Sequence, residues 1–207
     1  MTDVVDTPIH VPTRLDDEAR AQLFTNARTA NTFSPEPVTD AELAEIWELA
    51  KWAPTAANFQ PLRVTYVNSP EGRARLVSHM SEGNQAKTLA APAVALLAFD
   101  SRFHEHIPTV APFRAAMVPV MEENEEMRIN ASRFNSAIQA GYFVLAVRAL
   151  GFAAGPMGGF DAAAVDADFF PDGRFRSTLV VNIGHPTEDS YRDRGPRLDI
   201  AEVVRWA

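Results

Sequence analysis

The sequence predicts an α+β domain with one mixed, mainly antiparallel sheet flanked by helices. Helical and strand-like patterns mix along the chain without a regular βαβ rhythm. Two apolar runs, "AVALLAFD" and "STLVVNIG", are short enough for buried strands, and "RVTYVN" alternates as a strand does. Stretches with helical spacing lie between these runs.

The first predicted helix begins near Asp16 and continues through "EARAQLFTNAR". Residues 1–15 are predicted to be a loose segment, and residues 16–207 a single domain. A second helix is predicted after "FSPEPV", because Thr39 can act as its N-cap and Glu42, three residues later, completes a capping box. Pro54 is expected to end this helix. Four of its residues share one face: Leu43, Ile46, Trp47 and Ala50.

The middle of the chain predicts a strand at "RVTYVN", a helix at "EGRARLVSHM" and a buried strand at "AVALLAFD", which follows Pro92. Pro112 and Pro119 interrupt the next stretch, so the fold of residues 101–128 stays open. The acidic run "MEENEEM" within it is typical of a solvated helix face or loop.

The last part of the chain begins with a helical pattern from Ile129 to Leu150 that is apolar nearly all round. Such a helix is buried, either centrally or between subunits. "GFAAGPMGGFD" is predicted to be a glycine-rich connection, and "STLVVNIG" a buried strand. A final helix is predicted from Asp199 to Trp206.

Composition narrows the class of protein. The chain has 207 residues, 46% of them hydrophobic, a formal net charge of −8 and a pI of about 5.1. An acidic surface argues against nucleic acid or an anionic membrane as the main partner. The absence of cysteine removes thiol chemistry, so any redox reaction needs a bound cofactor. No secretory signal opens the chain and no apolar run reaches the roughly 18 residues that span a bilayer, so a cytoplasmic location is expected.

The sequence does not indicate a metal site, a serine hydrolase site or a Rossmann phosphate loop. The "HEH" run, His104 to His106, has no third ligand nearby, so surface histidines are expected there and no metal site is assigned. There is no GxSxG, which a serine hydrolase would favour. "GPMGG" is not GxGxxG and follows a helical pattern, so a Rossmann phosphate loop is not predicted.

Two basic stretches are candidate anion sites. The first stretch contains Arg28, Thr29 and Asn31. Its guanidinium and neighbouring hydroxyl suit a phosphate group. A surface arginine at a helix end would give the same pattern. The second stretch, "YRDRGPR", offers either an anion site or a solvated basic loop with Arg192, Arg194 and Arg197.

A third stretch, "KWAPTAANFQPLRV", joins a helical pattern to a strand and is rich in uncharged polar groups. Thr55, Asn58 and Gln60 lie on a backbone restricted by proline. Neutral donors and acceptors of this kind suit an uncharged, planar, polar heterocycle. The alternative is a turn whose side chains satisfy its own backbone.

Taken together, these stretches resemble the nitroreductase family of FMN-dependent oxidoreductases. The resemblance begins near Phe24 and continues to the C-terminus. "APTAANFQP" is similar to the family's AP[ST]xxNxQP, and "GNQAKTLAAP", the helix ending in "ALG", "GPMGGFD" and a C-terminal arginine follow in the family's order. "ARTAN", "KWAPTAAN" and "NIGH" look like the malonic semialdehyde reductase branch, which acts in pyrimidine degradation.

The resemblance implies a domain-entwined homodimer with two FMN molecules at the subunit interface. The ribityl and phosphate groups would contact Arg28, Thr29 and Asn31, with Arg192 and Arg194 also on the phosphate. The isoalloxazine would lie against a loop of the partner subunit comprising Pro54, Thr55, Ala56, Ala57 and Asn58. Asn84 and Lys87 would approach the polar edge of the flavin, and Asn135 its ring. The segment passing near flavin N5 would be Pro156, Met157, Gly158 and Gly159.

Two residues depart from the family pattern. Gly158 stands where many relatives have Glu in a PxEGF segment, so no carboxylate mechanism is expected there and space should open beside the flavin. Asn31 replaces a basic residue, which shifts phosphate binding toward Arg28 and Arg194.

The activity implied is NADH or NADPH oxidation by a ping-pong scheme through flavin N5, with no catalytic side chain assigned. The favoured substrate is malonic semialdehyde (3-oxopropanoate), reduced to 3-hydroxypropanoate. Broad nitroreductase or quinone reductase activity is the alternative within enzymes. A non-catalytic flavin-binding protein and an interaction domain without a cofactor are alternatives from other classes.

Overall fold

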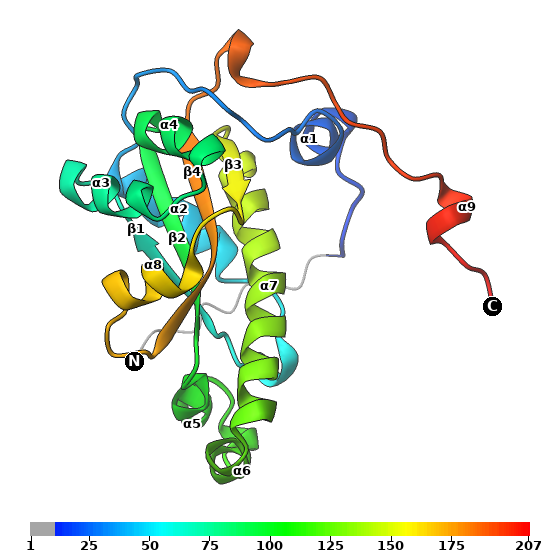
Figure 1. Cartoon of the computed structure of the whole chain (residues 1–207). Helices are drawn as coiled ribbons and strands as arrows, with labels where there is room; N and C mark the ends of the chain where they lie inside the picture. The colour runs from blue at the N-terminus through cyan, green and yellow to red at the C-terminus, as the bar shows by residue number, and fades with distance from the viewer. Residues whose placement is uncertain (1–10) are drawn as a thin grey trace.

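A four-stranded sheet organises the fold in the computed structural model, which describes residues 11–207. Its strands lie in the order β1-β2-β4-β3, and every neighbouring pair is antiparallel (Figure 1). The strands are β1 (Leu62–Tyr66), β2 (Ala93–Asp100), β3 (Ala153–Met157) and β4 (Phe175–Gly184). The predicted α+β class is confirmed. The expected mixture of parallel and antiparallel pairs is not found in this part of the chain.

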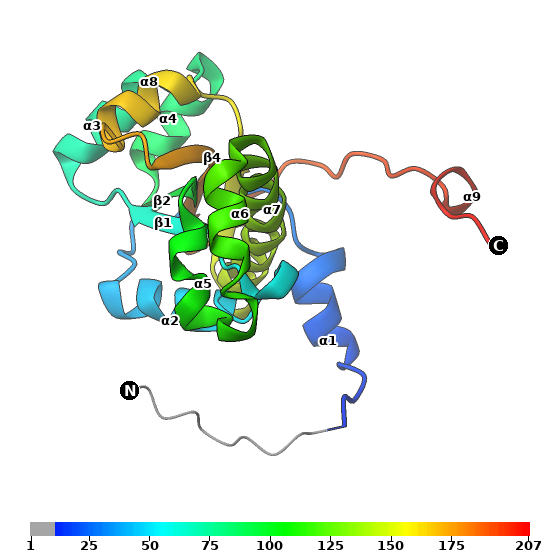
Figure 2. The ribbon, with the colours of Figure 1, turned by 90° about the horizontal axis from the view of Figure 1, so that it is seen from below.

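Strand β2 is central, and all eight of its residues are buried. Helices cover both faces of the sheet, which explains why "AVALLAFD" is apolar throughout rather than alternating. On one side lie α2 (Asp40–Ala50) and α7 (Glu125–Ala149), and on the other lie α3 (Pro70–Ser78), α4 (Glu82–Ala90) and α8 (Ala162–Phe169) (Figure 2).

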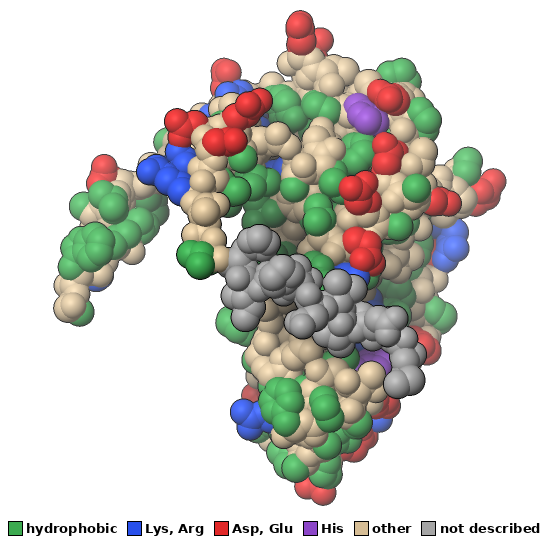
Figure 3. All heavy atoms as spheres, turned by 180° about the vertical axis from the view of Figure 1, so that it is seen from behind, with side chains coloured by type: hydrophobic (Ala, Val, Ile, Leu, Met, Phe, Trp, Pro, Cys, Tyr) green, Lys and Arg blue, Asp and Glu red, His purple; other side chains and the backbone are tan. Residues whose placement is uncertain are grey.

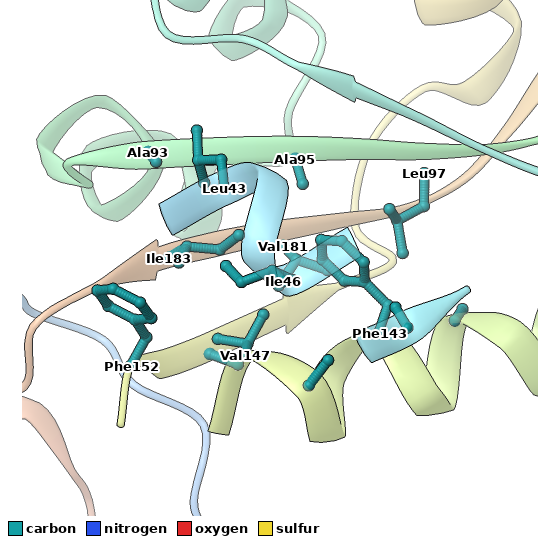
Figure 4. Close-up of a cluster of buried hydrophobic side chains, with 14 of the residues drawn as sticks. Leu43, Ile46, Ala93, Ala95, Leu97, Phe143, Val147, Phe152, Val181 and Ile183 are labelled. Atoms are coloured by element: carbon teal, nitrogen blue, oxygen red, sulfur yellow. The ribbon is translucent and has the colours of Figure 1, made fainter. Parts of the chain in front are cut away.

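Side chains of β2 alternate between two cores. Ala93, Ala95 and Leu97 face the core beneath α2 and α7, where Phe143 and Ile46 are fully buried (Figure 4). The opposite core contains Val94, Leu96 and Ala98 together with residues of α3 and α8.

The start of α2 is the capping box that the sequence predicts. Thr39 Oγ1 accepts from the Glu42 N–H at 3.3 Å, and Glu42 Oε2 accepts from the Thr39 N–H at 2.7 Å. The helix buries three of the four predicted residues, while Trp47 is half-buried. It ends at Ala50, four residues before Pro54, which agrees with the predicted end because a proline ring clashes with the carbonyl four residues earlier in a helix.

The N-terminal helix also begins where predicted. Asp16 caps α1 (Asp17–Arg20), and a π-helical turn, Ala21–Thr25, continues it. The helix stops there instead of reaching Arg28. Most of the predicted loose segment, residues 1–15, lies outside the described residues.

The glycine-rich connection predicted at "GFAAGPMGGFD" is wrong, because its first half forms the edge strand β3. An edge position tolerates Pro156, which has no N–H to donate to a neighbouring strand. Gly155 is needed because a Cβ there would lie 2.8 Å from the Ala30 carbonyl oxygen. Sequence analysis also left α4 and α8 unassigned, and it made the last helix too long, since α9 spans only Ile200–Val203.

The open region 101–128 folds into short helices that include α5 (Ile107–Val110) and α6 (Met117–Glu123). Phe103 and Ile107 pack with Phe59 in a small separate core. The acidic run is exposed where α6 meets α7, and Asn124 caps α7 by accepting from the Met127 N–H at 2.9 Å.

The surface location expected for both histidines of the "HEH" run is wrong for one of them. His104 is fully buried, and its Nε2 lies 2.6 Å from Glu122 Oε2. His106 is half exposed, 3.7 Å from Asp100 Oδ2. Within residues 11–207, no three histidine or acidic side chains are grouped so that they could hold a metal ion.

Helix α7 is not apolar all round as predicted. Its inner face carries buried polar side chains: Arg128, Ser132, Asn135, Ser136 and Gln139. Its outer face exposes Phe134 and Tyr142. Among the helices of residues 11–207, none is long and apolar enough to cross a membrane.

Candidate functional site

The loop between α2 and β1 has an unusual backbone. Three non-glycine residues adopt left-handed conformations, with φ of +48° at Ala57, +57° at Asn58 and +46° at Gln60. This conformation is unfavourable for a residue that carries a Cβ, and such strain is concentrated at functional sites. The loop lines a cavity of about 370 Å³ together with Lys51 and Trp52.

Polar side chains of this loop make local bonds. Thr55 Oγ1 accepts from the Gln60 N–H at 3.2 Å, and Gln60 Nε2 donates to Asn58 Oδ1 at 2.8 Å. Asn58 Nδ2 donates to the Val110 carbonyl at 2.7 Å, which ties the loop to α5. These are the contacts of a turn that satisfies its own backbone. The loop nonetheless leaves one side open to the cavity.

Asn135 lies beneath the loop and is 2% exposed. Its Oδ1 accepts from the Ala56 N–H at 2.6 Å, and its Nδ2 donates to the Ala131 carbonyl at 2.8 Å. The amide therefore contacts the loop directly. Its predicted contact with a flavin ring stays a prediction.

A basic cavity lies where residues 27–31 meet residues 191–197. The chain segment at Ala30 runs beside Tyr191 as a β-bridge, and the Ala30 N–H donates to the Ala154 carbonyl of β3 at 3.1 Å. This contact places the two predicted basic stretches on opposite sides of one cavity of about 270 Å³. Its lining residues are Ala27, Arg28, Thr29, Asn31, Arg192, Asp193, Arg194, Gly195 and Arg197.

The cavity carries four guanidinium groups against one carboxylate, and Figure 3 shows Lys and Arg side chains gathered where the C-terminal arm leaves the body. None of the four arginines forms an ion pair with any carboxylate of residues 11–207. Arg28 Nη1 donates to the Arg192 carbonyl at 3.1 Å, and Arg194 Nη2 donates to the Thr25 and Ala27 carbonyls at 2.6 and 2.9 Å. Guanidinium groups around a hollow suit an anion such as phosphate, so the predicted anion site stays a prediction that this geometry allows.

Arg197 belongs to this cavity but was not among the predicted cofactor contacts. The sequence did offer a signal, since "YRDRGPR" places Arg197 in the same basic run as Arg192 and Arg194. Helical or strand periodicity could not have shown which of the three faces the cavity, because the run has neither structure.

A neighbouring cavity of about 460 Å³ shares Asn31 and Arg192 with the basic cavity and adds Lys87 of α4. Asn84, on the same helix, donates through Nδ2 to the Gly159 carbonyl at 3.0 Å. A Cβ at Gly159 would lie 2.6 Å from Asn84 Nδ2, so a side chain there would displace the Asn84 amide. A Cβ at Gly158 would meet no atom within 4 Å, which agrees with the space predicted where relatives have Glu.

The structure therefore gathers the predicted residues into two groups. The first surrounds the adjoining basic cavities: Arg28, Thr29, Asn31, Lys87, Arg192 and Arg194, with Asn84 bonded to the segment that follows Pro156 and Met157 of β3. The second is the loop Pro54, Thr55, Ala56, Ala57 and Asn58 with Asn135. Of the second group, Pro54, Thr55 and Asn58 line a cavity separate from the two basic ones.

The fold is one shared with solved oxidoreductase structures. An NAD(P)H:FMN oxidoreductase, provisionally so named, from Staphylococcus epidermidis matches with a TM-score of 0.82 at 20% identity, over 95% of this chain and 98% of that one. A provisionally named nitroreductase in complex with FMN from Exiguobacterium sibiricum matches with a TM-score of 0.80 at 20% identity, over 96% and 100%. At this identity the likeness shows the fold alone.

The family is shown by sequence. The nitroreductase family profile matches residues 25–185. A Streptomyces coelicolor protein with the provisional name NADH dehydrogenase/NAD(P)H nitroreductase is 55% identical over 194 residues, covering 94% of this chain and 96% of its own length. The chain belongs to the nitroreductase family.

Proposed function

We propose that this protein is an FMN-dependent NAD(P)H oxidoreductase that acts as a homodimer and reduces 3-oxopropanoate to 3-hydroxypropanoate. The basic cavity is the observation that supports FMN binding: its four arginines have no ion-pair partner among residues 11–207 and surround a hollow that can take a phosphate. The matched Exiguobacterium structure contains FMN, and the name of the Streptomyces relative refers to NAD(P)H, which supports the same cofactors here.

The residues present fit FMN. Arg28, Arg192 and Arg194 would hold its phosphate, with Arg197 beside them in the same cavity. The neighbouring cavity with Lys87 gives room for the rest of the molecule. FMN, when bound, supplies a ring that takes two electrons from a nicotinamide and returns them to a second substrate. The chain's own part is to fix the phosphate, to present uncharged groups to the ring and to exclude water from it.

Exposed apolar residues on α7 and on the C-terminal arm support the homodimer. The outer face of α7 has helically spaced apolar or small residues, with Phe134 66% and Tyr142 42% exposed. The C-terminal arm, residues 192–207, extends away from the body and carries an apolar cluster (Figures 1 and 3). Its exposed members are Leu198, Ile200, Val203, Val204 and Trp206. An apolar surface of this kind marks a protein interface.

The outer edge of β1 offers a place for such an arm. No strand pairs with that edge among residues 11–207, and a groove of about 390 Å³ lies beside it. The groove is lined by Leu43, Ala44, Trp47, Leu62, Arg63, Val64 and Tyr66. A second copy would also bring its loop Pro54–Asn58 to the basic cavities of the first, which the resemblance implies. Each site would then draw residues from both chains.

The substrate proposal is based on the resemblance of "KWAPTAAN", "GNQAKTL" and "NIGH" to malonic semialdehyde reductases. A broad nitroreductase or quinone reductase is the second candidate, because the 55% identical relative is named as an NAD(P)H nitroreductase. Both candidates use the same flavin site and differ only in the second substrate.

Steady-state oxidation of NADH and of NADPH by the FMN-loaded enzyme separates these candidates. Turnover with 3-oxopropanoate that exceeds turnover with nitroarenes and quinones is the expected result. The reverse order would remove the semialdehyde and keep the oxidoreductase. Bound FMN without turnover of any acceptor would indicate a flavin-binding protein that is not an enzyme.

A further inference from the structure

The inner face of α7 carries a polar stripe of which only Asn135 is among the predicted cofactor contacts. Arg128, Ser132, Asn135 and Gln139 are spaced by three or four residues, so they share one face of the helix. They are 8%, 0%, 2% and 1% exposed, respectively. Buried polar side chains on an otherwise apolar helix face need partners, since an unpaired buried polar group is costly.

Every member of the stripe bonds to backbone elsewhere in the chain. Arg128 Nε donates to the Ser101 carbonyl at 2.9 Å, and Ser132 Oγ donates to the Asp100 carbonyl at 2.8 Å. Asn135 accepts from the Ala56 N–H, and Gln139 Oε1 accepts from the Leu62 N–H at 2.9 Å. The stripe therefore holds two adjoining segments, the loop that leads into β1 and the end of β2, where the Asp100 N–H donates to the Pro61 carbonyl at 2.9 Å.

The two amides of the stripe bracket the strained loop. Asn135 holds Ala56 just before the first left-handed residue, and Gln139 holds Leu62 just after the last one, Gln60. A backbone in these unfavourable conformations persists only where surrounding contacts fix it from more than one side. The Leu62 N–H belongs to the edge strand, on the end of the loop that leads into the sheet.

We propose that Gln139 is a positioning residue for the flavin site: through the Leu62 N–H it fixes the end of the loop Pro54–Gln60 and so the face that the loop presents to the ring. The inference rests on the proposed function, because the loop has a ring to face only if FMN binds. Gln139 itself touches neither FMN nor substrate. It acts together with Asn135, which holds the other end.

Three variants test this role. Gln139→Met keeps the length and removes the acceptor, Gln139→Glu keeps an oxygen acceptor, and Val147→Ala is a matched control that opens a cavity in the same helix away from the loop. The measurements are amide hydrogen exchange of residues 55–62 without FMN, the visible circular dichroism of bound FMN, the dissociation constant of FMN, and the thermal midpoint.

Gln139→Met is expected to speed exchange in residues 55–62, to change the flavin dichroism and to weaken FMN binding by about tenfold, the effect of leaving one buried donor unpaired. Gln139→Glu is expected to restore the dichroism, and Val147→Ala to lower the thermal midpoint while leaving exchange of the loop and the flavin signals as they were.

The proposal is overturned if Gln139→Met leaves exchange and dichroism unchanged, or if Val147→Ala alters them equally, since the glutamine would then serve general stability alone. A wild-type chain that binds no FMN would contradict the proposed function itself. Faster exchange in Gln139→Met would in that case show a purely structural contact and would also remove the flavin role.

Discussion

At the scale of single residues, we expect phosphate recognition to depend on guanidinium groups that have no carboxylate partner in the described part of the chain. Arg28 and Arg197 stand on opposite segments of the basic cavity, one from each end of the chain. A charge-assisted contact of this type is stronger than a neutral hydrogen bond. Removing either arginine should therefore weaken binding of the phosphate and leave the rest of the ligand unaffected.

We predict that Arg28→Ala and Arg197→Ala each raise the dissociation constant of FMN by about 10- to 100-fold, as the loss of a charged hydrogen bond implies. Fluorescence titration measures this. Riboflavin, which lacks the phosphate, should bind the variants and the wild type equally. Arg14→Ala removes an exposed arginine outside the cavity and should change neither affinity. Equal weakening of FMN and riboflavin would place the phosphate elsewhere.

Tyr66 gives a prediction for alkaline pH. Burial raises the pKa of its phenol from 10.0 to about 12, and its hydroxyl donates to the Leu43 carbonyl at 2.9 Å. The pKa of Tyr66 is higher in the folded chain than in the unfolded chain. Below about pH 10 the phenol is protonated in both states, so it does not change how the free energy of unfolding varies with pH. The unfolded chain ionises first, so the free energy of unfolding falls as pH rises from about 10 toward 12.

Urea unfolding across that pH range tests the assignment. Tyr66→Phe should be less stable than the wild type near neutral pH, because the hydroxyl's hydrogen bond is lost, and its stability should fall less steeply above about pH 10. Parallel slopes for the two proteins would mean that another group causes the alkaline loss.

At the scale of elements, the end of β2 is held by a buried carboxylate. Asp100 is fully buried, and it accepts from Arg63 Nη2 at 2.7 Å and from Arg174 Nε at 3.0 Å. Arg63 belongs to β1 and Arg174 precedes β4, so one carboxylate joins three strands. Desolvation is the larger effect on Arg63 and lowers its pKa, against the attraction of Asp100.

We predict that Asp100→Ala lowers the free energy of unfolding by about 3–5 kcal/mol, because it leaves two partly buried guanidinium groups without their partner. Glu105→Gln is the contrast: it breaks exposed pairs with Arg102 and Arg174 and should cost about 0–1 kcal/mol. Chemical denaturation measures the free energy of unfolding of both variants. Similar losses of this free energy in the two would contradict a buried role for Asp100.

The sequence predicted those elements whose signal is local. The capping box at Thr39 and the apolar run of β2 are each contained in a few neighbouring residues, and the structure has both. Strand β3 was missed because Gly155 and Pro156 are poor strand formers, and only contact with Ala30 and β4 explains them. The polar stripe of α7 was missed because Asn135 and Gln139 bond to residues 79 and 77 positions away.

In the candidate site, too, some features have a local sequence signal and others depend on contacts between distant parts of the chain. Periodicity could not bring residues 28–31 together with residues 192–197, since their contact depends on the whole fold. The family resemblance did indicate both segments, and the structure places them around one cavity. The cofactor contacts themselves stay predictions.

At the scale of the whole molecule, we expect the exposed apolar surfaces to be covered by a second copy of the chain. Tyr142 lies on the outer face of α7, and Trp206 on the C-terminal arm is 88% exposed. We expect the wild type to be a dimer by light scattering and Tyr142→Asp to shift it toward monomer, because a charge on an apolar interface is costly.

Loss of the dimer should also reduce FMN occupancy, if each site draws its loop from the second copy. Glu71→Arg, on the exposed side of α3, is the control that changes charge without touching that face. A wild-type monomer that binds FMN with full occupancy would contradict the shared site.

The proposed function requires that this chain bind FMN and exchange electrons with NAD(P)H. The most direct measurement is the visible absorbance of the purified protein with FMN, followed anaerobically by NADH or NADPH and then by 3-oxopropanoate. A flavin spectrum that bleaches with the nicotinamide and returns with the aldehyde is the result expected. Protein that leaves FMN free in solution, or bound FMN that neither nicotinamide bleaches, would contradict the claim.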